Sequence, residues 1–198
     1  MVRLISASTA IIGVILAAPV MLILAISIAA TMGRPVLFRQ DRAGLGGKPF
    51  KMLKFRSMRE AYDASGQPLP DADRITPLGR FLRRSRLDEL PELLNILRGE
   101  MAWIGPRPLL PHTISAMGDA GERRCAVRPG LTGWAQINGN SLLSDEEKLS
   151  LDLWYVENCN PLLNVMIVLA TIRVIIAGER VNQKALEKCR AGNPSRSS

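Results

Sequence analysis

The sequence is poor in the residues that build metal centres, disulfide frameworks and base-stacking surfaces. It has one histidine, and its three cysteines, at positions 125, 159 and 189, form no Cys-x-x-Cys pair. Such a set supports neither a zinc site nor a disulfide framework and favours a reducing, cytoplasmic compartment. Aromatic residues make up only 5% of the chain, which argues against a stacking surface for single-stranded nucleic acid. The glycine-rich segment 44–47 is not followed by Gly-Lys-Ser/Thr, which excludes a P-loop.

What the chain does have is apolar surface together with positive charge. Of its 198 residues, 47% are hydrophobic, and 26 Lys+Arg against 18 Asp+Glu give a net charge of +8. The length fits one domain with a substantial core. A basic balance of this size suits an anionic partner: nucleic acid, lipid headgroups or a phosphorylated substrate.

An uncharged apolar segment runs from Leu4 to Ala30. As a helix it is about 40 Å long, more than the ~30 Å hydrocarbon core of a bilayer and longer than the apolar region of a cleaved signal peptide. Pro19 interrupts it, and Arg3 on one side and Arg34 and Arg39 on the other leave the positive-inside rule without a preferred orientation. A single span and a helix that bends and returns to the same side both fit these residues.

The rest of the chain predicts short elements around this segment. Hydrophobic patterning, proline and glycine indicate a β-hairpin, a loop, two short helices, an apolar helix that is marginal in length for a span and contains a charged residue, and a frayed tail. The hairpin pairs 36–42 with 50–58, and the loop is 62–74. The two short helices are 76–87 and 91–97, the apolar helix is 161–177 in a core or interfacial position, and the tail is 191–198.

Two adjacent carboxylates, Asp88 and Glu89, precede Pro91. Since proline favours the first turn of a helix, we expect a helix to begin near Pro91, with the pair at or just before its N-terminus. That position keeps a carboxylate ionised and attracts phosphate. An ionised aspartate can attack phosphorus or hold Mg²⁺ against a diphosphate. Both residues are also ordinary N-terminal helix residues.

Cationic side chains recur in stiff or extended segments. Arg107 stands between two prolines and Arg128 precedes Pro-Gly, so each has a rigid frame suited to bidentate phosphate recognition, although a structural turn explains the same pattern. Along a strand, Lys54 and Arg56 face one side and Phe55 the other. Phosphate binding and attraction to a membrane surface both account for that pair.

Two amides, Gln136 and Asn138, alternate with apolar neighbours. On an extended segment they would share one face, where they could recognise a sugar or a base edge. Buried structural amides are the alternative.

Taken in order, these segments resemble the small monotopic phosphoglycosyl transferases, the PglC-like enzymes that initiate bacterial glycoconjugate assembly. The resemblance covers nearly the whole chain. Its motifs are the apolar segment with its internal proline, Phe-Arg-Gln-Asp-Arg-Ala-Gly at 38–44, Lys-Phe-Arg-Ser-Met at 54–58, Leu-Asp-Glu-Leu-Pro at 87–91, Gly-Pro-Arg-Pro at 105–108 and Arg-Pro-Gly-Leu-Thr-Gly-Trp-Ala-Gln at 128–136.

The resemblance implies a ping-pong reaction. Asp88 attacks the β-phosphate of a UDP-sugar and expels UMP, and undecaprenyl or another polyprenyl phosphate then collects the phosphosugar from the enzyme. Glu89 matches a base or positioning residue, and Mg²⁺ is expected beside Asp88. The expected substrate-binding residues are Arg83, Arg107, Arg128, Lys54, Arg56 and Gln136.

The fold that this resemblance implies is α/β but mainly α. A re-entrant helix over residues 1–34 has both ends in the cytoplasm, residues 35–190 form the catalytic domain with interfacial amphipathic helices, and 191–198 form a flexible tail. The enzyme is expected at the cytoplasmic face of the bacterial inner membrane, with a homodimer as one compatible assembly. Two departures are Ala18 before Pro19, where many relatives have serine, and Arg86, where they have a small residue.

The expected donor is a UDP-linked N-acetylated amino sugar such as UDP-di-N-acetylbacillosamine. A different class of function is a non-catalytic, membrane-anchored basic protein that binds anionic lipid or nucleic acid. It explains the charge and the anchor, but not the coexistence of the Asp-Glu, Gly-Pro-Arg-Pro and Arg-Pro-Gly motifs. We therefore expect an enzyme that does not bind nucleic acid.

Overall fold

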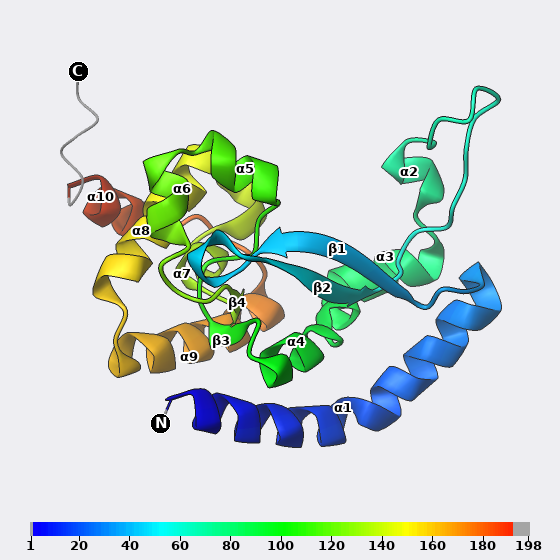
Figure 1. Ribbon diagram of the computed structural model, residues 1–198, viewed down its shortest axis with the longest axis horizontal. Helices are drawn as coiled ribbons and strands as arrows, with labels where there is room; N and C mark the ends of the chain where they lie inside the picture. Colours follow the sequence, from blue (N-terminus) through cyan, green and yellow to red (C-terminus); the bar gives the residue numbers. More distant parts are fainter. Residues whose placement is uncertain (1, 192–198) are drawn as a thin grey trace. The chain divides into compact units, whose positions relative to one another are not determined.

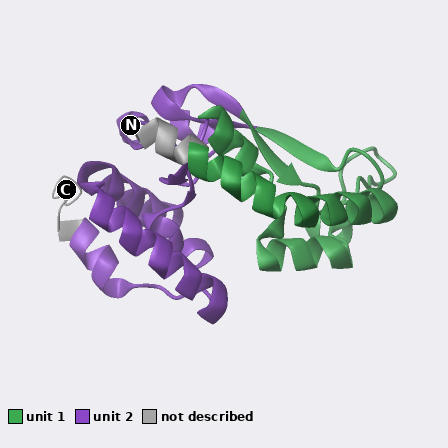
Figure 2. Ribbon diagram, turned by 90° about the horizontal axis from the view of Figure 1, so that it is seen from below, with its two compact units in different colours: residues 1–40, 51–99 green, residues 41–50, 100–198 purple. Residues whose placement is uncertain are grey.

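The structure, a computed structural model, describes residues 2–191, with side chains for residues 8–189. It contains two compact units, shown in Figure 2. Unit 1 comprises Met1–Gln40 and Lys51–Gly99, and unit 2 comprises Asp41–Phe50 and Glu100–Ser198.

The helices of unit 1 lie close to the ranges that the sequence predicts (Figure 1). They are α1 (Val2–Met32), α2 (Asp71–Arg74), α3 (Pro77–Ser85), the 3₁₀ turn η2 (Leu87–Glu89) and α4 (Glu92–Arg98). The two short helices predicted over 76–87 and 91–97 are confirmed as α3 and α4. The predicted loop 62–74 is wrong at its end, where α2 forms, because Pro70 sets the chain for a helical turn that Asp71 and Asp73 favour.

α1 confirms the predicted apolar helix. Its segment Ser8–Met32 is long and apolar enough to cross a membrane. The helix bends in its middle, as Figure 1 shows. Pro19 lies inside it, and a proline there removes a backbone donor and favours a kink. Large apolar side chains such as Ile15 and Leu16 are exposed, so much of the helix presents a surface suited to lipid.

One side of α1 is nevertheless packed. Leu24, Ile28 and Met32 form a buried cluster with Phe55 and Leu82 of unit 1. Burying side chains of this size stabilises a fold by about 1.5–3 kcal/mol each. The C-terminal half of α1 is therefore part of unit 1 and not a separate anchor.

The predicted hairpin is confirmed as β1 (Leu37–Ala43) paired with β2 (Pro49–Phe55). The turn between them requires glycine, since Gly46 and Gly47 have φ of 63° and 74°. Asn95 of α4 is fully buried. Its side chain accepts from the Leu53 N–H at 3.0 Å and donates to the Lys51 carbonyl at 2.8 Å, which ties α4 to β2.

Unit 2 is a group of helices with a small parallel strand pair. Its elements are β3 (Ala102–Ile104), α5 (Pro111–Ala116), α6 (Asp119–Arg124), β4 (Gly130–Thr132), α7 (Trp134–Ile137), the 3₁₀ turn η3 (Asn140–Leu142), α8 (Asp145–Asn158), α9 (Pro161–Ala177) and α10 (Gln183–Ala191). β3 and β4 run parallel, with Ala102 opposite Gly130 and Ile104 opposite Thr132. The sequence patterns did not predict this pair, because each strand has only three residues.

The predicted extended face for Gln136 and Asn138 is wrong, because both belong to a helical turn. Gly133, the residue after β4, is fully extended, and the helical turn of α7 begins directly after it. The Asn138 side chain donates to the Trp134 carbonyl at 2.8 Å and accepts from Asn182 at 2.8 Å. Asn138 is thus a buried structural amide. Four residues of alternating pattern fit a strand and a helical turn equally well.

α9 confirms the apolar helix predicted over 161–177. Leu163 and Ile167 are its buried residues, whereas Leu162 and Ile176 are 80% and 81% exposed. A helix with so much exposed apolar surface fits an interfacial position better than a core position. Of the expected tail, the first residue ends α10 and residues 192–198 lie outside the described part of the chain.

Candidate active site

The predicted position of the acidic pair is confirmed. Asp88 and Glu89 lie in η2, directly before α4. The chain reverses between α3 and η2 at Arg86, which has the left-handed conformation (φ 57°, ψ 17°). A non-glycine residue in this region is uncommon and marks a constrained turn. The backbone of Arg86 therefore makes the turn that sets η2 against α3.

The turn that carries the pair is anchored to the membrane helix. Leu87 and Leu90, which flank the two carboxylates, pack against the buried cluster that α1 forms with β2 and α3. Apolar residues on each side of Asp88 and Glu89 thus hold the carboxylates beside the C-terminal half of α1. The two carboxylates therefore lie next to a helix that exposes large apolar side chains.

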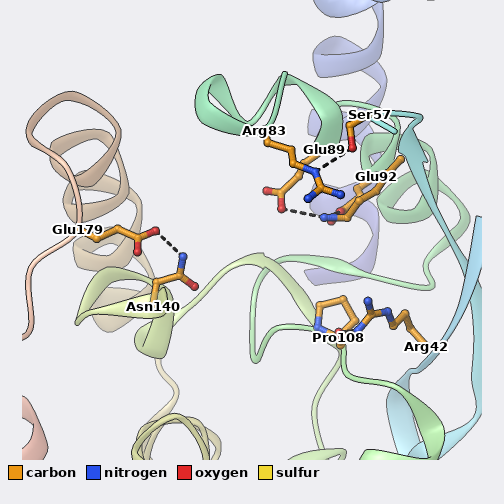
Figure 3. A network of polar contacts seen from close by, with 9 residues as sticks. Arg42, Ser57, Arg83, Glu89, Glu92, Pro108, Asn140 and Glu179 are labelled. Atoms are coloured by element: carbon orange, nitrogen blue, oxygen red, sulfur yellow. Dashed lines mark hydrogen bonds and ion pairs between the residues drawn. The ribbon is translucent and has the colours of Figure 1, made fainter. Parts of the chain in front are cut away.

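Glu89 is fixed by an ion pair. Lys54 of β2 lies between two carboxylates, with Nζ 2.9 Å from Glu89 Oε1 and 3.2 Å from Glu92 Oε1. Figure 3 labels the two carboxylates, Glu89 and Glu92. The three side chains are 14%, 11% and 4% exposed, so water screens their charges weakly.

Asp88 is in a different state from Glu89. Burial raises the pKa of Asp88, Lys54 opposes this rise, and the Glu89 carboxylate adds to it. Within the described residues, its carboxylate accepts a hydrogen bond from its own backbone N–H and has no ion-pair partner within 4.0 Å. Asp88 is thus a partly dehydrated carboxylate that is left available for chemistry.

The predicted phosphate ligands of unit 1 take two different positions. Arg83, in the last turn of α3, donates from Nε to Ser57 Oγ at 2.9 Å and acts electrostatically on Asp88. Arg56 donates to the Met32 carbonyl at the end of α1, where a cation is favoured. Lys54 and Arg83 are therefore brought to the acidic pair, while Arg56 caps the membrane helix.

In unit 2, close backbone contact joins the segments that carry Arg107 and Arg128. The Gly130 N–H donates to the Pro106 carbonyl at 2.9 Å and the Gly105 N–H donates to the Thr132 carbonyl at 2.9 Å. A Cβ on Gly130 would lie 2.1 Å from the Gly105 nitrogen. Only glycine permits this approach, which places the two predicted phosphate-binding loops side by side.

The backbone around Arg107 is rigidly held, as its flanking prolines predicted. Four successive carbonyls, those of residues 106 to 109, accept hydrogen bonds, in turn from Gly130, Arg124, Arg42 and Ala43. The contact of Arg42 with Pro108, at 3.1 Å, is visible in Figure 3. The backbone of Arg107 is thus fixed on both sides of its side chain.

The donor to the Arg107 carbonyl belongs to a buried ion pair that the sequence analysis missed. Arg124 of α6 contacts Asp152 Oδ2 of α8 through Nε at 2.9 Å and Nη2 at 2.7 Å, and both side chains are 4% exposed. Burial raises the pKa of Asp152, and Arg124 opposes the rise. The signal in the sequence is a lone carboxylate between Leu151 and Leu153, which does not identify its partner.

Gln136 is the third predicted ligand in unit 2. Its side chain is buried, at 4% exposure, and neither its nitrogen nor its oxygen has a hydrogen-bond partner within the described residues. A buried amide without partners costs free energy. Its donor and acceptor are suited to a bound water or a polar ligand.

The residues at Asp88 fit Mg²⁺ of the kind that accompanies phosphates. Within the described part of the chain, no group of three or more His, Cys, Asp or Glu side chains can hold a metal ion. Mg²⁺ does not need such a cage, since it typically binds through one or two carboxylates, substrate phosphates and water. The available carboxylate of Asp88 meets that requirement.

Comparison with known proteins places this site in a family. Residues 1–178 match the bacterial sugar transferase family. EpsL of Bacillus subtilis (strain 168), named as an uncharacterized sugar transferase, is 45% identical over 152 residues, 77% of this chain and 75% of EpsL.

Two further relatives have names that state a reaction. A UDP-glucose:undecaprenyl-phosphate glucose-1-phosphate transferase of Xanthomonas campestris pv. campestris is 39% identical, over 79% of this chain and 35% of its own length. A UDP-N-acetylgalactosamine-undecaprenyl-phosphate N-acetylgalactosaminephosphotransferase of Aeromonas hydrophila is 38% identical, over 85% and 42%. The chain spans less than half the length of these two relatives. It belongs to the bacterial sugar transferase family, the group of phosphoglycosyl transferases that its ordered motifs predicted.

Proposed function

We propose that this protein transfers a sugar 1-phosphate from a UDP-sugar to undecaprenyl or another polyprenyl phosphate and releases UMP. The observation that carries the proposal is the available, partly buried carboxylate of Asp88, next to the ion-paired Glu89 and beside the lipid-facing helix α1. The names of the Xanthomonas and Aeromonas relatives support the same reaction.

The chemistry follows in two steps. A carboxylate oxygen of Asp88 attacks the β-phosphorus, the bond to the UMP oxygen breaks, and the phosphosugar remains on Asp88. A phosphate oxygen of the polyprenyl phosphate then attacks the same phosphorus and the Asp88 carboxylate leaves. Lys54 and Arg83 offset the negative charge that gathers at phosphorus. Mg²⁺, held by Asp88 and the diphosphate, would neutralise part of the charge on the leaving UMP.

The reaction is tested by incubating the purified protein with undecaprenyl phosphate and a panel of UDP-sugars and measuring UMP. We expect release with one or a few sugars, and a stronger response to an N-acetylated amino sugar such as UDP-di-N-acetylbacillosamine. The asparagines at 138 and 140 do not support this choice, since Asn138 is structural and Asn140 donates to Glu179 at 2.5 Å (Figure 3). The Aeromonas relative is the remaining support. Absence of release with every sugar, together with salt-dependent nucleic acid binding, would favour a non-catalytic basic protein.

The pH dependence of the first step reports on Asp88. Burial raises the pKa of Asp88 above its ordinary value of 3.8, and protonation removes the nucleophile. UMP release should therefore fall as the pH is lowered through this raised pKa, at a higher pH than an exposed aspartate would require. The measurement is the rate of UMP release against pH, with circular dichroism to confirm that the fold persists. An acid limb centred at or below pH 3.8 would contradict the assignment.

Glu89 serves the reaction beyond its ion pair with Lys54. Glu89→Gln should lower kcat about 100-fold, the range of general acid–base catalysis, with a smaller change in KM for the UDP-sugar. Glu92→Gln is the matched control, since Glu92 is the second carboxylate on Lys54, and it should lose less than about tenfold. Equal losses in both variants would limit Glu89 to positioning Lys54.

α1 enters the membrane from the cytoplasmic side, bends near Pro19 and returns. Its bend and its exposed apolar side chains support this topology, as does α9 with its exposed apolar surface. Single cysteines at positions 3 and 34, in a background where the exposed Cys159 is serine, should both react with an impermeant maleimide only from the cytoplasmic side. Labelling from opposite sides would establish a true span.

A further inference from the structure

A cavity of about 590 Å³ lies in unit 1 at the end of the membrane helix. Its lining consists of Pro35, Val36, Leu37, Phe38, Arg39, Arg56 and Glu60. The volume is within the range of small-molecule sites. The resemblance gives Arg56 as a substrate-binding residue, but neither it nor the comparisons assign a role to the other six residues of this lining.

The lining combines apolar and charged side chains, which suits an amphiphilic ligand. The first four residues that line the cavity are apolar, and Phe38 is 45% exposed. Two arginines and one glutamate give the lining a net charge of 2 − 1 = +1. In a UDP-sugar only the faces of the uracil ring are apolar, so most of that molecule does not match a wall of four consecutive apolar residues. An isoprenoid phosphate has the matching chemistry, with an anionic head for the guanidinium groups and an apolar tail.

The cavity is attached to the last turn of α1. The Arg56 side chain donates to the Met32 carbonyl, and the Arg56 backbone N–H donates to the Val36 carbonyl at 2.9 Å. Its walls are therefore held where the apolar helix ends. A ligand whose tail lies in the same bilayer as α1 can place its head in this cavity without leaving the membrane.

Residues 54 to 57 connect the cavity to the side chains around the candidate nucleophile. Lys54 contacts Glu89, and Arg56 follows two residues later, about 7 Å along an extended segment. Ser57, the next residue, accepts from Arg83. Contacts of Lys54 and Ser57, on the two sides of Arg56, thus connect the cavity lining to Glu89 and Arg83.

We infer that this cavity receives the phosphate end and the first part of the tail of the polyprenyl phosphate acceptor. The inference rests on the proposed function, because the acceptor is the second substrate of that reaction. Arg39 and Arg56 bind the phosphate, Pro35 to Phe38 line the path of the tail, and Glu60 limits the affinity so that the lipid product can leave.

Direct binding tests the location without turnover. The probe is a short-chain prenyl phosphate with a photoreactive diazirine in its first isoprene unit, applied to the Asp88→Asn variant in vesicles of neutral phospholipid. We expect cross-links in segments 35–39 and 56–60, and loss of labelling when unlabelled prenyl phosphate is added. Cross-links confined to other segments, or equal displacement by the same concentration of an anionic phospholipid, would overturn the assignment.

Steady-state kinetics with the acceptor give the second measurement. Arg39→Gln should raise KM for the prenyl phosphate about tenfold, the loss of one charge-assisted hydrogen bond, and should leave the UMP released in a single turnover without acceptor within about twofold. Glu60→Gln should lower the same KM. Arg80→Gln removes an exposed arginine of α3 that does not line the cavity, and should change neither quantity.

The two proposals fail in different ways. If wild-type protein releases UMP but Arg39→Gln and Arg80→Gln have the same acceptor KM, the cavity inference is wrong and the proposed function stands. If no UDP-sugar yields UMP, the proposed function is wrong, and the cross-links still decide whether a prenyl phosphate binds here.

Discussion

Replacing Asp88 by asparagine should lower UMP release by about 10⁴-fold or more, the scale on which loss of a nucleophile or its partner acts. The amide has nearly the same shape as the carboxylate but does not attack phosphorus. The same variant should fold at least as stably as wild type. Because burial raises the pKa of Asp88, its ionised form is disfavoured in the folded state. The stability it contributes is therefore present at low pH and lost as the pH rises through the raised pKa, and asparagine avoids that loss.

Two measurements separate this outcome from a structural defect. Intact-protein mass spectrometry after incubation with a UDP-sugar and no acceptor should show a phosphosugar adduct on wild type and none on Asp88→Asn. Thermal unfolding in the same detergent should give a Tm equal to or above that of wild type. Undiminished turnover of Asp88→Asn would show that another group carries the phosphosugar.

Truncating Asp152 to alanine should destabilise the protein by about 3–5 kcal/mol, the cost of leaving a buried cation without its partner. Arg124 is 4% exposed and would have no carboxylate to contact. Because Arg124 also donates to the Arg107 carbonyl, the loosened contact should weaken the hold on that loop. We therefore expect a raised KM for the UDP-sugar in whatever fraction remains folded.

The same two helices provide a matched control. Arg123 of α6 and Glu157 of α8 also form an ion pair, but their side chains are 55% and 49% exposed. Glu157→Ala should change the free energy of unfolding by less than about 1 kcal/mol, since water screens exposed pairs. Urea unfolding of both variants in detergent measures the difference. If Asp152→Ala is no more harmful than Glu157→Ala, the buried pair does not hold unit 2 together.

A third variant separates the effect of the two buried charges from the effect of the volume that their side chains fill. Replacing Arg124 by methionine and Asp152 by leucine together removes both buried charges, and such replacements are often neutral or stabilising. We expect this double variant to recover most of the stability that Asp152→Ala loses. It should not recover the KM for the UDP-sugar, because methionine cannot donate to the Arg107 carbonyl.

The sequence by itself determined the features that depend on neighbours in the chain. The apolar run from Leu4 to Ala30 was sufficient to predict α1. The glycines after residue 43 predicted the turn between β1 and β2, and Pro91 predicted the start of α4 and hence the position of Asp88. The prolines around Arg107 likewise predicted its rigid backbone. Each of these features depends on steric limits or on a hydrophobic pattern among residues that are close in the chain.

Tertiary structure alone decided which of these residues meet. Lys54 pairs with Glu89 across 35 residues, and Arg124 pairs with Asp152 across 28. The two amides show the same limit, since Asn138 pairs with Asn182, 44 residues away, whereas Gln136 has no partner in the described part of the chain. Many partners are chemically acceptable for each of these groups. The choice among them depends on how helices and strands pack over distant parts of the chain, which local patterns do not encode.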